Sequence, residues 1–212
     1  MNFSIDLIDS DNKIYKKILS SLLPEVIKFM NEKSSRLNKE FPLLINNIIS
    51  NTPEYQSILS GQLKYEFGIP DSSVLLTGLL NTWISNIFVQ YKKPYIAGNK
   101  IVSSFSIAAF KIDFTDVLNS EYAFMQDTVR NYSLPWLEWL VLDGTKIIVP
   151  EYSVVMGPSP NSRTGNALMR HSAKSWSVPS EFAGTLSDNW ITRAIDNSAD
   201  EIDNLLTRIF SS

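Results

Sequence analysis

The chain has 212 residues, of which 44% are hydrophobic and 19% charged, and its formal net charge at pH 7 is -3. These proportions are those of an ordinary globular protein that can bury a substantial core. The acidic balance argues against a dedicated nucleic-acid-binding protein, which normally carries a surplus of Lys and Arg. The absence of cysteine excludes disulfide bonds and thiolate metal sites.

No segment has the character of a secretion signal or of a membrane span. Residues 1–11 already carry Asp6, Asp9 and Asp11, and no basic region precedes an apolar stretch. The densest apolar runs, 74–80 and 136–142, are far shorter than the ~20 residues that cross a bilayer. We therefore expect no membrane partner.

Helical periodicity dominates the first part of the chain. Apolar residues recur every three or four positions over 11–36, with lysines and glutamates between them: Ile14, Ile18, Leu22, Val26, Phe29. This pattern predicts a long first helix, capped by Asp11 and kinked or restarted at Pro24. A second helical stretch is expected over 43–49, and Pro53 is expected to open a further short one.

The character of the sequence changes after an interrupted connector at 60–72. A capped helix is expected from 72 to about 81. The β-branched and aromatic segments 83–91 and 101–114 are typical of strands, and residues 94–100 supply the turn between them.

The next part of the chain alternates short elements. Periodicity does not decide between helix and strand over 115–133. A short helix is predicted over 134–142, with Pro135 at its first position and a stop at the following Asp-Gly. Two short strands are predicted over 146–149 and 152–156.

The last element is the most regular. Residues 188–210 carry an apolar stripe with acidic residues mostly off it, which predicts an amphipathic helix; the stripe consists of Ile191, Ile195, Ile202, Leu205, Leu206 and Ile209. The sequence thus favours an α+β fold in one domain, 1–212, with a long N-terminal helix and the C-terminal amphipathic helix packed on a mainly antiparallel sheet. The helical N-terminal part is 1–60, and the sheet-containing part is 72–212.

Catalytic chemistry is poorly represented. His171 is the only histidine, and its neighbour Ser172 would point to the opposite face of a strand, so the two cannot form a hydrolase pair. A small hydrolase would need a cleft that gathers His171 or the carboxylates Asp113, Asp116 and Glu121. With one histidine and no cysteine, we expect no metal site, no cofactor and no catalytic residue.

The loop 157–162, Gly-Pro-Ser-Pro-Asn-Ser, is glycine-containing but lacks the features of a phosphate cradle. Pro158 and Pro160 remove two amide donors that such a cradle requires. A turn or an extended arm is the expected structure.

The five tryptophans can belong to a nucleic-acid-binding surface, to the core or to a subunit interface. Stacking on nucleic acid is disfavoured, because basic residues are scarce around them. Trp136 and Trp139 are expected in the core. For Trp176 and Trp190, core packing and a subunit interface are equally favoured, and the alternatives stay open.

The segment 155–210 carries a series of short motifs in a fixed order. It runs from Arg163-Thr164-Gly165 through Leu168-Met169 and a Gly184-Thr185 turn to Asn189-Trp190-Ile191-Thr192-Arg193-Ala194-Ile195. This order resembles the tail-completion, or head–tail joining, proteins of tailed bacteriophages, in which a Thr-Gly strand start precedes a Gly-Thr turn and a Phe-hydrophobe-Arg-Ala-Leu helix start. Here Trp replaces Phe and a Thr precedes the Arg, and residues 40–150 have no counterpart in the family.

The resemblance implies a virion structural protein, not an enzyme, located in the neck or tail and assembled in the host cytoplasm. It implies a ring of this chain, a hexamer, at the proximal end of the tail, in contact with head–tail connector and tail-tube proteins. Genomic DNA would pass through the lumen without specific binding. A baseplate or head-connector adaptor subunit is the alternative role. The residues that carry the motif or are expected at assembly contacts are Pro158, Pro160, Arg163, Thr164, Gly165, Trp176, Pro179, Gly184, Thr185, Asn189, Trp190 and Arg193.

Overall fold

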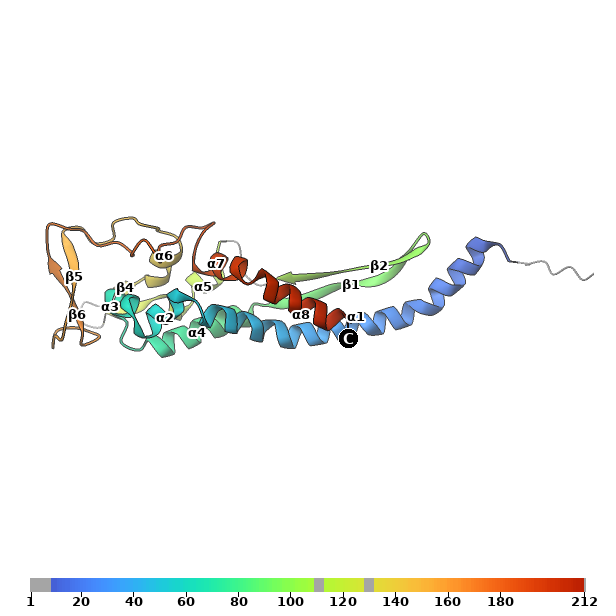
Figure 1. Cartoon of the computed structure of the whole chain (residues 1–212), viewed down its shortest axis with the longest axis horizontal. Helices are drawn as coiled ribbons and strands as arrows, with labels where there is room; N and C mark the ends of the chain where they lie inside the picture. The colour runs from blue at the N-terminus through green and yellow to red at the C-terminus, as the bar shows by residue number, and fades with distance from the viewer. Residues whose placement is uncertain (1–8, 109–112, 128–131, 212) are drawn as a thin grey trace, which may run out of the picture.

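The computed structural model describes residues 9–108, 113–127 and 132–211. The described part is α+β, as predicted, with helices at both ends of the chain and antiparallel strand pairs between them. The molecule is elongated: a single long helix runs along most of its length, and the other elements pack beside it (Figure 1).

That helix, α1 (Asp11–Ser50), is continuous through both Pro24 and Pro42. Of the two alternatives expected at Pro24, a kink or a restart, the restart is therefore wrong. Pro24 is exposed, so the carbonyl that loses its amide partner there can bind water. The expected cap is also displaced by one residue: Ser10 is the N-cap, and Asp11 is the first helical residue. At ~1.5 Å per residue, the 40 residues span about 60 Å.

Three short helices follow α1. Thr52 caps α2 (Pro53–Ser60) by accepting a hydrogen bond from the amide of Tyr55, and Pro53 occupies the first turn as predicted. The expected connector at 60–72 contains a helix, α3 (Gln62–Phe67), which ends at Gly68 with φ of 69°. Helix α4 (Ser72–Ser85) extends four residues beyond its predicted end.

A long hairpin lies along α1. Strands β1 (Phe88–Ala97) and β2 (Lys100–Ala108) pair antiparallel, with a register shift between Lys92 and Tyr95. The side-chain amide of Asn38 on α1 pairs with the backbone of Val89 as another strand would, by accepting from its N–H (3.0 Å) and donating to its carbonyl (3.3 Å). The predicted strand 101–114 is confirmed as far as Ala108; residues 109–112 lie outside the described part, and Asp113 and Phe114 are not in a strand. The predicted strand 83–91 is confirmed only from Phe88, because residues 83–85 finish α4.

The stretch left undecided by periodicity contains both kinds of element. Helix α5 (Thr115–Leu118) and a 3₁₀ turn η1 (Glu121–Ala123) precede a pair of short strands, β3 (Met125–Asp127) and β4 (Tyr132–Leu134). Helix α6 (Trp136–Val141) then begins one residue after Pro135, close to its predicted position.

The next strand pair, β5 (Tyr152–Met156) and β6 (Ala167–His171), lies across the end of the molecule opposite the start of α1 (Figure 1). The strand predicted over 146–149 is wrong. Only an isolated bridge joins Val149 to Trp176, because Pro150 interrupts the chain immediately after it.

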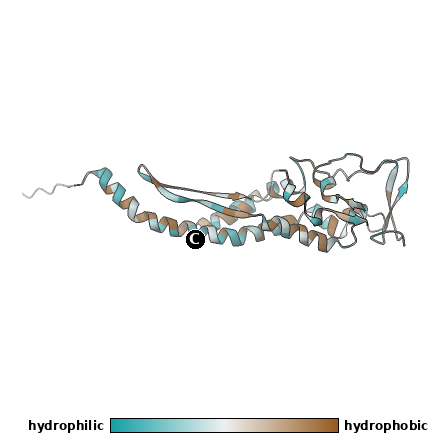
Figure 2. Ribbon diagram, turned by 180° about the vertical axis from the view of Figure 1, so that it is seen from behind, coloured by the Kyte–Doolittle hydropathy of each residue, from teal (hydrophilic) through white to brown (hydrophobic). Residues whose placement is uncertain are grey.

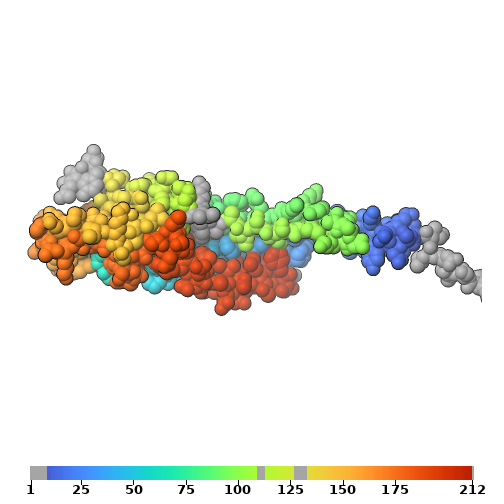
Figure 3. All heavy atoms as spheres, turned by 90° about the horizontal axis from the view of Figure 1, so that it is seen from above, coloured from blue at the N-terminus to red at the C-terminus, as the bar shows by residue number. Residues whose placement is uncertain are grey.

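The C-terminal helix is divided in two. Helix α7 (Trp190–Asn197) ends at Ser198, and α8 (Ala199–Ser211) follows at once. Helix α8 packs on α1, where Arg208 bonds Glu40 at 2.5 Å, and on the hairpin, where the rings of Phe210 and Phe105 lie 5.0 Å apart. Figure 3 shows α8 and the β1–β2 hairpin as neighbouring ridges, with the first turns of α1 projecting beyond both.

One apolar core runs through the body of the molecule. It takes side chains from α1 only from residue 37 onward, and joins them to α2–α4, α6 and α7; among its fully buried members are Leu37, Ile45, Leu79, Trp83, Trp136 and Trp190. In Figure 2 apolar residues crowd this body but also continue along the projecting part of α1.

Candidate assembly surfaces

The predicted site residues separate into an interior group and an exposed group. Trp176, Asn189 and Trp190 are buried. Pro158, Pro160, Arg163 and Gly165 are exposed in one loop, with Thr164 half-buried among them; the remaining residues, Pro179, Gly184, Thr185 and Arg193, hold the segment that leads into α7.

Trp190 fills the centre of the fold. Its ring meets that of Trp83 edge-on at 5.5 Å, and its indole N–H donates to the Thr52 hydroxyl at 2.6 Å. Of the two alternatives left open for Trp190, the structure selects the core. The same holds for Trp176, whose indole N–H donates to Glu66 at 3.0 Å and whose ring stands edge-on to Phe67.

Asn189 fixes the start of α7 through a reciprocal capping box. Its side-chain oxygen accepts from the amides of Ile191 (3.0 Å) and Thr192 (3.2 Å), and the Thr192 hydroxyl accepts from the Asn189 amide (2.8 Å). The Asn189 amide group also donates to the carbonyl of Thr185 at 2.8 Å. The turn and the helix start of the motif therefore form one bonded unit.

Arg193 joins that unit to α2. Its guanidinium bonds Glu54 at 2.9 Å and Asp188 at 3.1 Å, and donates to the carbonyls of Phe182 (3.3 Å) and Ala183 (3.4 Å). Burial lowers the pKa of Arg193, but the hydrogen bonds to the two carboxylates outweigh that effect and hold the pKa above its ordinary value. We call Arg193 with its four partners the Arg193 latch.

Pro179 and Gly184 determine the conformation of the loop 179–184, to which the Arg193 latch is hydrogen-bonded. The Pro179 carbonyl accepts from the amides of Phe182 and Ala183, both at 2.9 Å, which makes a tight turn. A Cβ on Gly184 would lie 2.6 Å from Cβ of Asn189 and 2.8 Å from the carbonyl oxygen of Leu140. Only glycine therefore fits between α6 and the start of α7.

We accordingly expect Gly184→Ala to lower the free energy of unfolding by about 1–3 kcal/mol, because backbone as well as side-chain atoms must move to admit the methyl group. Urea unfolding followed by circular dichroism measures the loss. Gly98→Ala is a useful control for backbone strain alone, since no atom lies within 4 Å of its added Cβ although its φ is 61°. Equal losses at the two sites would contradict steric exclusion at Gly184.

The exposed group forms a folded loop at the end of the β5–β6 hairpin. Gly157 donates to the carbonyl of Asn166 (2.8 Å) and Ser159 to that of Gly165 (2.9 Å), so the pairing of the hairpin continues into the loop. The guanidinium of Arg163 lies over Gly68, 3.1 Å from where a Cβ would stand. The loop is a structured turn held by its own hydrogen bonds, one of the two structures expected for it.

The β5–β6 hairpin also displays large apolar side chains. Val154 and Met169 pack against the core, whereas Tyr152, Val155 and Met156 are exposed. We call β5, β6 and loop 157–166 the distal hairpin. Isolated apolar side chains on a surface are ordinary, but a group on a projecting hairpin is typical of a contact surface.

The opposite end carries a second group of exposed apolar side chains. Among residues 11–29 of α1 no side chain is buried, although the segment is rich in large apolar residues. One stripe of these follows the helix with spacings of three, four, four and three residues, which keeps its members on one face; it consists of Tyr15, Ile18, Leu22, Val26 and Phe29. All but the half-buried Val26 are 41–54% exposed. Residues 11–29 are called the overhang.

The overhang and the tip of the β1–β2 hairpin enclose a groove. It is lined by Leu22, Glu25, Val26 and Phe29 of the overhang and by Ile101 of β2, and its volume is about 440 Å³. Since four of the five lining residues are apolar, water in the groove is poorly bound and easily displaced. We call this the overhang groove.

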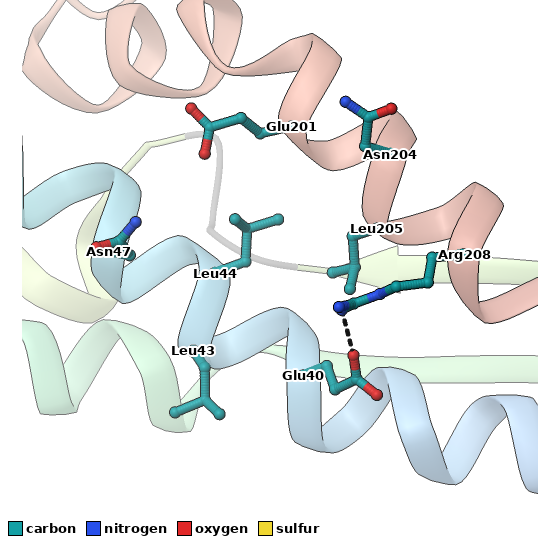
Figure 4. Close-up of a pocket in the computed structure, with 8 residues that line it drawn as sticks. All are labelled: Glu40, Leu43, Leu44, Asn47, Glu201, Asn204, Leu205 and Arg208. Atoms are coloured by element: carbon teal, nitrogen blue, oxygen red, sulfur yellow. Dashed lines mark hydrogen bonds and ion pairs between the residues drawn. The ribbon is translucent and has the colours of Figure 1, made fainter.

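A second groove, of about 550 Å³, lies between α1 and α8 (Figure 4). Leu44 and Leu205 point into it, and the Arg208–Glu40 ion pair spans it at one end. Its lining is mixed, with Asn47, Glu201 and Asn204 beside the leucines. This groove is the seam of two packed helices of the same chain.

The residues considered for catalysis do not form a common site. His171 faces Glu151 at 3.8 Å, but both side chains are more than 70% exposed, on the distal hairpin and the turn before it. Asp113 instead bonds the amide and hydroxyl of Thr115, and Asp116 accepts from Asn86, in and before α5 near the middle of the molecule (Figure 1). Glu121, the third carboxylate considered, is exposed at the start of η1.

The described residues hold neither a metal-binding cluster nor a helix that could span a membrane. Across 9–108, 113–127 and 132–211, no group of three His, Asp or Glu side chains is arranged to hold a metal ion. Within the same ranges, no helix combines the length and apolar character that a membrane crossing requires.

Sequence reasoning missed the overhang groove and the Arg193 latch. The sequence predicts an apolar helical stripe over the overhang residues, but periodicity shows only that a face is apolar and not what covers it.

Comparison of the chain with models of protein families, with curated proteins and with solved structures found no match.

Proposed function

We propose that this chain is a structural subunit of a tailed-phage virion, of the neck or tail-completion type. In this role, copies of the chain assemble into a ring at the proximal end of the tail, which joins the tail to the head connector. The proposal rests on the motif in 155–210 and on the distribution of exposed apolar side chains.

The observation that carries the proposal is an elongated molecule with different apolar surfaces at its two ends. The overhang displays Tyr15, Ile18, Leu22 and Phe29, and the distal hairpin displays Tyr152, Val155 and Met156. A ring subunit needs surfaces of this kind, because each copy touches the next through two unlike patches and also touches the layers above and below. An enzyme would instead be expected to concentrate its exceptional features in one pocket.

The buried motif residues also support the proposal, because they fix the segment that carries the distal hairpin. The capping box, the Arg193 latch and Gly184 hold the segment 176–193 rigidly between the core and the distal hairpin. A rigid base keeps the hairpin in one position, which limits the conformational entropy lost when it docks. The net charge of -3 also suits a lumen through which DNA passes without adhering.

Light scattering of the purified full chain over a range of concentrations, with electron microscopy of the same samples, tests the proposal. We expect a closed ring with a single copy number. A protein that stays monomeric at every concentration, alone and with lysates of phage-infected cells, would overturn it.

A second prediction concerns the loop of the distal hairpin. Deletion of 157–162 is expected to leave the circular dichroism spectrum and the thermal midpoint nearly unchanged, because the hydrogen bonds of this loop are mostly internal. Attachment of the ring to tail or connector particles is expected to be lost, since the exposed Pro158 and Pro160 lie in the loop that joins the two strands of the hairpin. Co-sedimentation with particles is the measurement; an unfolded deletion variant or undiminished attachment would contradict this role.

A further inference from the structure

We propose that the apolar stripe of the overhang binds an acidic amphipathic helix of a partner protein, which lies end to end with α8 and places a carboxylate on Lys33. This inference goes beyond the proposed function, because the binding surface is complete in a single copy of the chain and does not require a ring.

The apolar stripe of the overhang is the continuation of the face of α1 that α8 covers. Beyond Phe29 this face continues at spacings of four, four, three and four residues, through Lys33, Leu37, Glu40 and Leu44. Glu40 and Leu44 face α8 (Figure 4). Helix α8 ends beside the middle of α1, and the overhang continues beyond that end (Figure 1). One face of α1 is therefore covered by a helix along part of its length and exposed along the overhang.

Helix α8 shows which chemistry this face of α1 accepts. It buries Leu205 and Ile209, and its first five residues carry three carboxylates, Asp200, Glu201 and Asp203. At ~1.5 Å per residue, the stripe from residue 15 to residue 29 is about 21 Å long, and the 13 residues of α8 span about 20 Å. A second helix of the same length and character matches the stripe, through apolar side chains that recur every three or four residues.

Charge at this end of the molecule favours an acidic partner. The overhang has four lysines and two carboxylates, and the hairpin 88–108 has three lysines and no carboxylate. Asp9 offsets part of this charge by pairing with Lys13 and Lys17. The overhang, Asp9 and the hairpin still carry a net charge of +4, in a chain whose total is -3. An acidic helix is attracted to this surface, whereas a second overhang or hairpin would bring like charges together.

Lys33 gives an independent indication of an acidic partner. Its side chain is 2% exposed, and its ammonium group lies 4.9 Å from the centre of the Phe29 ring, which lines the overhang groove. Its ion pair with Glu32 measures 3.9 Å, beyond hydrogen-bonding distance, and solvent screens the pair because the Glu32 side chain is 62% exposed. A buried ammonium group that is paired this weakly destabilises a fold. A carboxylate of the bound helix would supply the missing hydrogen bond.

The test titrates the full chain into a fluorescent peptide with the sequence of α8, residues 199–211, and measures binding by fluorescence anisotropy. We expect saturable binding, and binding at least about ten-fold weaker by a peptide that carries Asp200→Lys, Glu201→Lys and Asp203→Lys. Leu22→Ser in the full chain should weaken binding of the acidic peptide to a similar extent. Val155→Ser is the matched control and should leave binding unchanged, because Val155 is nearly as exposed as Leu22 (44% and 49%) but lies on the distal hairpin.

Lys33→Met separates binding from folding. It should weaken peptide binding at least about ten-fold. It should leave the thermal midpoint of the free chain unchanged or raised, because methionine removes a buried charge and keeps most of the packing. A lower midpoint would show that the chain itself satisfies Lys33, and would overturn the inference.

The remaining outcomes are equally decisive. The inference is overturned if the acidic peptide does not bind, if the lysine peptide binds as well, or if binding survives Leu22→Ser. Self-association that Leu22→Ser abolishes, without peptide binding, would assign the stripe to a second copy and would also overturn it. A ring that does not bind the peptide leaves the proposed function standing, whereas a permanent monomer that binds it overturns the proposed function alone.

Discussion

Replacing Trp190 with alanine is expected to lower the free energy of unfolding by about 3–5 kcal/mol. Trp190 has no exposed surface and lies where α7 meets α1, α2 and α4. The substitution leaves a large cavity beside Trp83, and it also removes the donor to Thr52, the residue that caps α2. Both losses act on the same junction, so the effect should be near the upper end of the range for core tryptophans.

Chemical unfolding monitored by far-ultraviolet circular dichroism measures this loss. Trp190→Phe is the informative companion, because it keeps most of the ring volume and loses the hydrogen bond to Thr52. It should cost about 1–2 kcal/mol, the order of one buried hydrogen bond with a small change of shape. A loss below 1 kcal/mol for Trp190→Ala would mean that the surrounding helices do not pack on this ring.

The long elements of the fold were predictable because their patterns are local. The apolar spacing of α1 and of the C-terminal helices is visible in any short window of sequence. The interruptions were harder to place. Pro24 does not break α1, since only a solvent-facing carbonyl loses its partner, whereas no proline or glycine marks the break at Ser198 between α7 and α8.

Tertiary packing decided the other differences. Trp83, Ile84 and Ser85 have strand-like neighbours in sequence, but they finish α4, where Trp83 is buried against Trp190. Such long-range burial overrides local β preference. Gly61, Gly68 and Pro70 suggested a connector at 60–72, yet Leu63 and Phe67 are core residues on a helix, α3.

The candidate surfaces were predictable only in part. The sequence predicted a turn or an extended arm for the loop with Pro158 and Pro160, and the structure shows the turn. It could not distinguish the buried Trp176 and Trp190 from interface residues, because a tryptophan has the same apolar surface in either setting. The overhang groove depends on where the tip of the hairpin comes to rest beside α1, which requires the three-dimensional arrangement.

Arg193→Met is expected to lower the free energy of unfolding by about 2–4 kcal/mol. The side chain of Glu54 is only 8% exposed, and without Arg193 its carboxylate keeps no ion pair in the described structure. The loss should fall short of that for a fully buried pair, because Arg193 is itself 31% exposed and solvent screens part of its charge. The methionine keeps much of the aliphatic packing, so the loss reports on the charge and its hydrogen bonds.

A double-mutant cycle with Glu54→Gln separates the ion pair from the rest of the Arg193 latch. Glu54→Gln with Arg193→Met should be more stable than Arg193→Met alone, since no buried charge is then left without its partner. Some loss should remain, because the carbonyls of Phe182 and Ala183 also lose their donor. If the double variant were no more stable than Arg193→Met, the carbonyl contacts, and not Glu54, would account for the stability that Arg193 provides.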